Sequence, residues 1–154
     1  MEKQYKPFEV EVNALGFYVN RAFSMMVKSL NKELRNADLN IQHAEFSIMK
    51  LLNEIKGGTQ SQLATLLGKE RSGISRTLSQ LEEKGYISRQ PLDGKTNYVV
   101  LTLTGQELMP VLNAVADKVS KKTFKGFSKK SQESIVNNLT KIYLNALSNI
   151  DITD

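Results

Sequence analysis

The chain has 154 residues, which is enough for one ordinary domain and too few for a large multidomain enzyme. Apolar residues make up 40% of the chain and charged residues 24%, so neither a disordered tail nor a fibrous repeat fits this composition. The 21 lysines and arginines exceed the 16 acidic residues and give a net charge of +5, which mildly favours a polyanionic partner.

The residue types also disfavour several kinds of chemistry. The chain contains no cysteine, which excludes disulfides, thiolate metal sites and thiol-based redox switches. Because His43 is the only histidine, a zinc site would need carboxylates for nearly all of its ligands, and we expect no metal and no other cofactor. There is no glycine-rich nucleotide-binding motif, and only His43 could serve as the base for a serine nucleophile. We therefore expect no enzyme activity.

The sequence carries no apolar segment of the length that a membrane requires. No stretch approaches 18 consecutive apolar residues, and residues 1–7 are polar where a secretory signal would be apolar. We therefore expect a cytoplasmic protein without a membrane partner.

The N-terminal part of the chain predicts one long amphipathic helix that starts near Phe8. Its apolar residues recur at spacings of three and four: Val12, Leu15, Val19, Ala22, Met26, Leu30 and Leu34. A helix of about 28 residues would be roughly 40 Å long, which is more than the core of one small domain covers. Something besides that core is expected to cover the remaining length.

The centre of the chain predicts three helices followed by a β-hairpin. Helices are expected over about 42–55, from Thr59 to Gly68 and over about 71–84, and strands over about 86–89 and 96–101. Gly57 and Gly58 suit the end of the first helix, and Thr59 with Gln62 has the spacing of a capping box. This order is that of a winged helix-turn-helix, whose second helix can lie in the major groove of DNA.

The C-terminal part returns to long amphipathic helices. One stripe consists of Leu108, Val111 or Leu112, Val115 and Val119, and another of Ile135, Leu139, Ile142, Tyr143 or Leu144, and Leu147. Long striped helices at both ends of a short chain predict a homodimer, and a monomeric helical bundle is the alternative. The predicted fold is mainly α with a small β-hairpin. It comprises an N-terminal dimerisation helix in residues 1–40, a winged helix-turn-helix lobe in 41–104 and C-terminal dimerisation helices in 105–154.

The helix over 71–84 presents the residues that we expect to contact DNA. With Ile74, Leu78 and Leu81 directed to the core, the outward residues are Arg71, Ser72, Ser75, Arg76 and Ser79. Arginine can donate two hydrogen bonds to guanine, and serine hydroxyls reach phosphates or base edges. The free amides and the dipole at the start of the helix would also favour a phosphate.

The hairpin predicts a second DNA contact. Lys95 lies at its tip, where a cation could enter the minor groove or meet the backbone, and Arg89 is expected to contact DNA beside it. Asp93 belongs to the same predicted site, where its carboxylate could hold Arg89 or Lys95 in place. An exposed turn can also carry a lysine that is only solvated. The two helices before the hairpin are what favour a DNA contact at its tip.

Residues 59–108 resemble the DNA-binding core of MarR-type transcriptional regulators. The resemblance rests on the order and spacing of short motifs: Gln62-Leu63-Ala64, Ile74-Ser75-Arg76 with Leu78, Leu81 to Ile87 with Arg89, Asp93-Gly94-Lys95, and Leu101-Thr102 with Gly105 and Leu108. The flanking helices are similar to the family's dimerisation helices. The resemblance implies a homodimer on a pseudo-palindromic operator in double-stranded DNA, often repressing transcription until a small phenolic or otherwise amphipathic ligand, or an oxidant, weakens binding.

The sequence departs from the family pattern at several positions. Lys95 stands where the family usually has arginine, so groove reading by a planar guanidinium is not expected there. Glu70 replaces a small residue before the recognition helix, and Gly73 replaces a serine or threonine. The oxidant-responsive branch depends on cysteine, which this chain does not contain.

Two questions stay open at the level of sequence. His43 is a candidate for lining a ligand cleft, although a partly exposed residue at the start of a helix is the plainer interpretation. The same lobe could dock a protein instead of DNA, or it could bind DNA without ligand control. The motifs fit an activator as well as a repressor, and they specify neither the operator, the effector nor the regulated genes.

Overall fold

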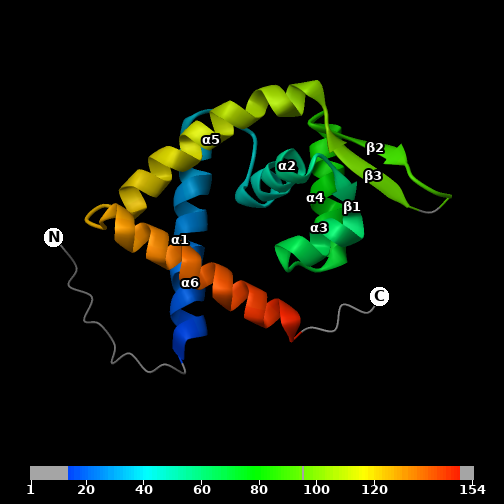
Figure 1. The fold of residues 1–154 in the computed structure, drawn as a ribbon. Helices are drawn as coiled ribbons and strands as arrows, with labels where there is room; N and C mark the ends of the chain where they lie inside the picture. The colour runs from blue at the N-terminus through cyan, green and yellow to red at the C-terminus, as the bar shows by residue number, and fades with distance from the viewer. Residues whose placement is uncertain (1–13, 95, 150–154) are drawn as a thin grey trace. The chain divides into compact units, whose positions relative to one another are not determined.

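The computed structural model describes residues 14–94 and 96–149 of the chain (Figure 1). The helices are α1 (Leu15–Asn36), α2 (His43–Ile55), α3 (Gln60–Leu67), α4 (Arg71–Glu83), α5 (Leu103–Thr123) and α6 (Lys129–Ser148). The strands are β1 (Gly58–Thr59), β2 (Ile87–Pro91) and β3 (Asn97–Leu101). The predicted fold, mainly α with a winged helix-turn-helix, is confirmed. The chain forms two compact units, residues 1–119 and 120–154.

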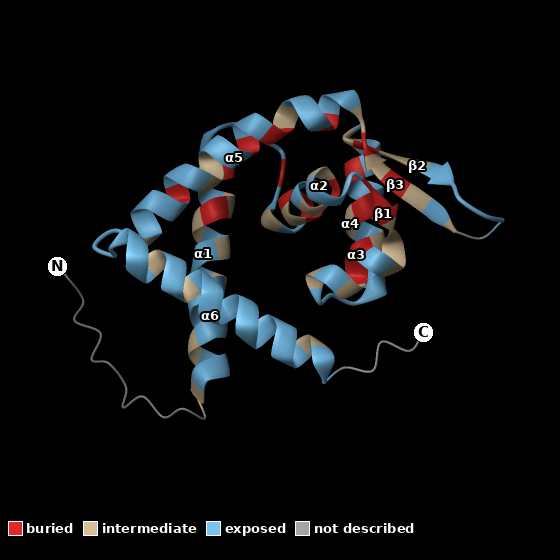
Figure 2. Cartoon of the chain, in the orientation of Figure 1, coloured by how far each residue is buried: buried red, intermediate tan, exposed pale blue. Residues whose placement is uncertain are grey.

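The core of the first unit lies where α2, α3 and α4 pack against the sheet. Buried apolar side chains concentrate there (Figure 2). Ile74, Leu78 and Leu81 of α4 are all buried, as the helical period predicts. Each such side chain contributes about 1.5–3 kcal/mol of burial free energy, so the inward row fixes which face of α4 points to solvent.

The two strands of the predicted hairpin are present, and the structure adds a third. The sheet has the order β1-β3-β2, and both pairings are antiparallel. Arg89 pairs with Val99 in the hairpin, and Gly58 pairs with Val99 from the other side. The two-residue strand β1 is too short to show a strand period, which is why the sequence did not predict it.

The turns around α3 are largely as predicted. The capping box is confirmed: the Gln62 amide donates to Thr59 Oγ1 at 3.2 Å, and the Thr59 amide donates to Gln62 Oε1 at 2.9 Å. The end of α2 differs in detail, because Lys56 and not a glycine takes the left-handed conformation, with φ 62°. Gly57 follows with φ 125°, and a Cβ there would lie 2.6 Å from the ring of Tyr98.

A buried ion pair fixes the last turn of α4. Lys84 Nζ lies 2.6 Å from Glu45 Oε1 and donates to the Asn40 carbonyl at 2.8 Å. Glu45 is 3% exposed, and its other oxygen accepts from the Gln42 amide at 2.9 Å. Because both charges are paired and hydrogen-bonded, the carboxylate can be buried without leaving an unsatisfied charge.

The long helices at the ends of the chain leave apolar side chains exposed. Helix α1 begins at Leu15, and the earlier part of the predicted helix, from Phe8, lies outside the described residues. Its exposed apolar side chains are Leu15, Phe17, Val19, Phe23, Met25 and Met26. Within its own unit, α6 has no buried residue, although it carries an apolar stripe. No helix in the described ranges is long and apolar enough to cross a membrane.

Candidate nucleic-acid interface

Helix α4 presents the polar face that the sequence predicts. Arg71, Ser72, Arg76 and Ser79 are exposed, and Ser75 is half-buried. The opposite face carries the three buried apolar residues, so the outward row is rigidly held by the core. Such a face can donate hydrogen bonds to base edges and to phosphates.

The first turn of α4 is open to an anion. Glu70 is the residue before the helix, as expected, and its side chain does not cap the first amides. The amides of Arg71, Ser72 and Gly73 have no acceptor within the helix, because they belong to its first turn. With the helix dipole, they favour a phosphate at this end, whereas the charge of Glu70 opposes one.

A hydrogen bond joins the starts of the two helices of the motif. Gln60 Nε2, in the first turn of α3, donates to the Arg71 carbonyl at 3.2 Å. The start of α3 and the start of α4 are therefore held together, and both lie beside the same hollow.

That hollow lies between α3, α4 and the hairpin and has a volume of about 260 Å³. The polar residues that line it come from β1, α3, α4 and the hairpin: Thr59, Gln60, Ser61, Arg71, Arg89, Thr96 and Asn97. Two arginines line this hollow next to the N-terminus of α4, and guanidinium groups and helix N-termini both favour negatively charged groups. The residues from the start of α3 were missed by the sequence reasoning, because their approach to the hairpin depends on the packing of the whole lobe.

Arg89, which is expected to contact DNA beside Lys95, lies in the region that the sequence predicts as a strand, and its contact with DNA stays a prediction. It lies on β2 against α4, where Nε is 3.1 Å from Glu82 Oε2 and Nη2 donates to Ser79 Oγ at 3.1 Å. Of the two partners suggested for Asp93, Arg89 instead pairs with Glu82, and Lys95 lies outside the described residues.

At the tip of the hairpin, Asp93 stabilises the turn. Its Oδ1 accepts from the Thr96 amide at 2.8 Å, and Asp93 is exposed. Lys95 lies outside the described residues, so its predicted contact with DNA stays a prediction. The strands β2 and β3 extend away from α3 and α4 (Figure 1).

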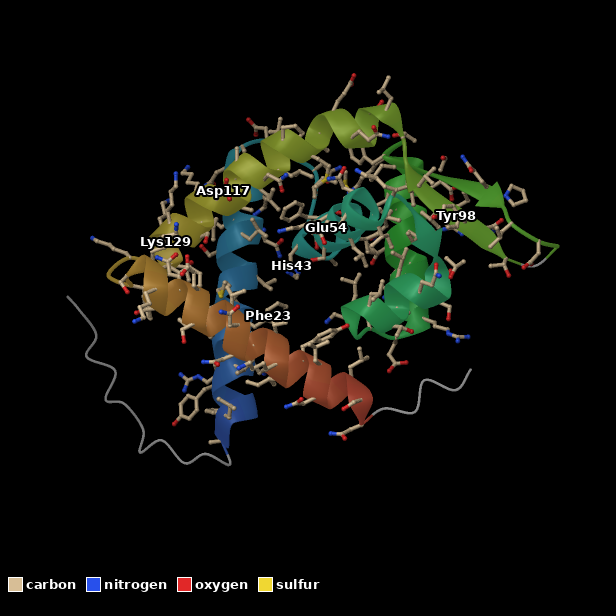
Figure 3. The ribbon with its side chains drawn as sticks, in the orientation of Figure 1. Phe23, His43, Glu54, Tyr98, Asp117 and Lys129 are labelled. Atoms are coloured by element: carbon tan, nitrogen blue, oxygen red, sulfur yellow. The ribbon has the colours of Figure 1, made fainter. Side chains whose placement is uncertain are left out.

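His43 is the first residue of α2 and is half-buried. Its ring packs edge-on against Phe23 of α1, with ring centroids 5.4 Å apart (Figure 3), and its amide donates to Asn31 Oδ1 at 2.7 Å. Burial, and after it the charge of Lys69, lowers the pKa of His43. These contacts make His43 a packing residue between α1 and α2, and its predicted role in binding a ligand stays a prediction. Across residues 14–94 and 96–149, no cluster of acidic side chains and histidine could hold a metal ion.

Comparison with known proteins shows that the lobe is similar to MarR-family regulators. Residues 41–94 match the model of the MarR family. A MarR transcriptional regulator from Methanosarcina mazei Go1 superposes with a TM-score of 0.81 at 21% identity, covering 92% of this chain and 94% of that chain.

Two further structures show the same fold. A mutant MarR from E. coli complexed with operator DNA matches with a TM-score of 0.74 at 19% identity, covering 89% of this chain and 99% of that one. BpsR from Bordetella bronchiseptica matches with a TM-score of 0.74 at 17% identity, covering 90% of this chain and 98% of that one. The DNA binding of BpsR is regulated by 6-hydroxynicotinic acid. The resemblance to MarR-type regulators is thus confirmed, in sequence over the lobe and in fold over most of the chain.

Proposed function

From this MarR-type fold and the arginines and serines on the outward face of α4, we propose that the protein is a DNA-binding transcriptional regulator. The observation that carries the proposal is the face of α4, where Arg71, Ser72, Ser75 and Arg76 stand opposite the buried row. The E. coli MarR complexed with operator DNA supports the assignment, because its fold is shared over 89% of this chain. We place its action in the cytoplasm.

We further propose that the regulator acts as a homodimer on a pseudo-palindromic operator. The exposed apolar residues of α1 and the unburied stripe of α6 favour association with a second copy, since water would otherwise cover them. Two recognition helices in one dimer would read half-sites about one helical turn, ~10 bp, apart. A symmetric dimer should elute at twice the monomer mass in size-exclusion chromatography with light scattering.

Repression, with release by a small amphipathic or phenolic ligand, completes the proposal. The DNA binding of BpsR is regulated by 6-hydroxynicotinic acid, which is an aromatic acid of this kind. A ligand that weakens operator binding must bind the free protein more tightly than the complex, by the same factor. The test is a titration of 6-hydroxynicotinate and salicylate against the preformed complex, with benzyl alcohol as an uncharged aromatic control.

The central experiment measures affinity for the DNA upstream of the protein's own gene. Fluorescence anisotropy at several salt concentrations should show tight, site-specific binding that weakens steeply as salt increases. No preference over a scrambled duplex, or an affinity that is insensitive to salt, would refute the proposal. Either result would favour the second candidate, a winged-helix module that docks a protein through α4.

Arg76→Ala tests the outward face directly. Arg76 is exposed on α4, and its loss should weaken operator binding by roughly 1–3 kcal/mol if it contacts a base. Arg35→Ala is the matched control, because Arg35 is an exposed arginine in the last turn of α1 and its removal changes the net charge equally. Equal effects of the two variants would mean that Arg76 acts only through the overall charge.

A further inference from the structure

The guanidinium of Arg89 is held by two side chains of α4. Nη2 donates to Ser79 Oγ at 3.1 Å, and Nε lies 3.1 Å from Glu82 Oε2. The Nε–H group is buried and is not aimed at the carboxylate, so the contact with Glu82 is an ion pair and not a linear hydrogen bond. These contacts orient the planar group and leave other N–H donors of its five available.

The held guanidinium lies beside the polar hollow. Arg89 lines this hollow together with Arg71 and the start of α3, and its side chain is 26% exposed. An arginine in this place can meet a group in the hollow only if its side chain stays folded against α4. A free arginine side chain populates many rotamers, and each has to be given up when the side chain binds.

We propose that Glu82 and Ser79 are positioning residues for Arg89, which they hold at the hollow to meet a phosphate of the DNA backbone. The inference rests on the proposed DNA-binding function and adds a role for an acidic residue on the recognition helix. Glu82 acts in two opposite ways: its charge repels the duplex at long range, and its contact orders Arg89. We expect the positioning effect to be the larger at moderate salt, because salt screens the long-range repulsion from Glu82 more than it screens the direct contact at 3.1 Å with the partly buried Arg89.

The neighbouring acid provides a charge-matched control. Glu83 follows Glu82 in the last turn of α4, is also exposed, and makes no ion pair within the described part of the chain. Glu82→Gln and Glu83→Gln change the net charge equally and keep the side-chain length. A difference between them in DNA affinity therefore reports the contact with Arg89 and not the overall charge.

The experiment measures the affinity of the full chain for an operator duplex by anisotropy at 100 and 300 mM salt. We expect Glu82→Gln to bind about two- to tenfold more weakly than Glu83→Gln, which is the range for one side chain that must be ordered on binding. In an Arg89→Ala background the two glutamine variants should bind alike, because no guanidinium is left to position. A merely structural role of Glu82 would persist in that background.

Several outcomes would overturn the inference. Glu82→Gln binding as tightly as Glu83→Gln, or more tightly, would show that Glu82 only repels DNA or competes for Arg89. If Glu82→Gln does not fold, judged by circular dichroism, Ser79→Ala replaces it, since that change removes the Nη2 acceptor without altering charge. The loss of DNA affinity caused by Ser79→Ala must then disappear in the Arg89→Ala background, or the inference is wrong. Failure of the unaltered protein to bind any duplex would refute the proposed function as well, whereas equal glutamine variants refute the positioning role alone.

Discussion

Substitution of Gly105 by alanine tests a close approach between the backbone of Tyr86 and the start of α5. Gly105 is the third residue of α5, and a Cβ on it would overlap the carbonyl oxygen of Tyr86 and lie 3.1 Å from the carbonyl carbon. The two segments are joined by hydrogen bonds: the Thr102 amide donates to the Tyr86 carbonyl at 3.0 Å, and Thr102 Oγ1 donates to the Gly85 carbonyl at 2.7 Å. Because the obstacle is backbone and not a flexible side chain, α5 or the turn after α4 must move.

The magnitude follows from two opposing effects. Overpacking costs about 1–3 kcal/mol or more, while alanine in a helix gains at most ~1 kcal/mol over glycine. The net loss of unfolding free energy should be roughly 1–2 kcal/mol, which for a chain of this size lowers Tm by about 2–8 °C. Urea and thermal denaturation followed by circular dichroism at fixed protomer concentration measure this change, because dimerisation makes Tm depend on concentration.

Gly73→Ala is the control for this prediction. Gly73 is likewise the third residue of its helix, α4, but a Cβ there would meet no atom within 4 Å. It should therefore leave stability unchanged or raise it by up to ~1 kcal/mol. If the two alanine variants unfolded at the same urea concentration, the close approach between α5 and Tyr86 would be refuted.

Three further predictions concern other contacts. Lys84→Met leaves the Glu45 carboxylate buried without its cation and should lower the unfolding free energy by about 1–3 kcal/mol. The loss is smaller than for a fully buried pair because Lys84 is 26% exposed. An unchanged midpoint of urea denaturation would refute this prediction. Burial, and after it the charge of Lys69, lowers the pKa of His43 below 6.5. The neutral form of His43 therefore stabilises the folded protein fully above pH 6.5, and this stability is lost as the pH falls through the lowered pKa. His43→Gln should therefore show a smaller loss of stability than the unaltered protein between pH 7.5 and pH 5, and parallel curves would contradict the shift. Ser128→Ala removes the hydroxyl that accepts from the Ser131 amide at 3.1 Å and should cost ~1 kcal/mol of helix stability, seen as lower ellipticity at 222 nm.

The secondary structure of the lobe was predictable because its signals are local. The capping box at Thr59 depends on residues three apart, and the inward row of α4 depends on the helical period, so both are written in short stretches of sequence. The two-residue strand β1 is too short to carry any period, and it was missed. The left-handed residue that ends α2 was also misplaced, because glycine is preferred there but Lys56 adopts the conformation while Gly57 is needed against Tyr98.

The candidate site was predictable only in part, for a physical reason. The outward face of α4 follows from the inward row, so its five polar residues could be named from sequence. The partner of Arg89 could not, because two acids, Glu82 and Asp93, were both within reach along the chain. The choice depends on how β2 packs against α4, which is a tertiary contact. The hollow likewise requires α3, α4 and the hairpin to be assembled before it exists.

The contacts that hold the two ends of α4 do not involve the side chain of Arg76. Gln60 fixes its first turn through the Arg71 carbonyl, and Glu45 fixes its last turn through Lys84. Arg76 is exposed between these two attachments. Substitutions of Glu45 or Lys84 should therefore change the unfolding free energy first and DNA affinity only as a consequence, whereas Arg76→Ala should change affinity at constant stability. Measuring both quantities on the same variants separates the support of the helix from its contact with DNA, because a face that only stabilised the lobe would change the two together.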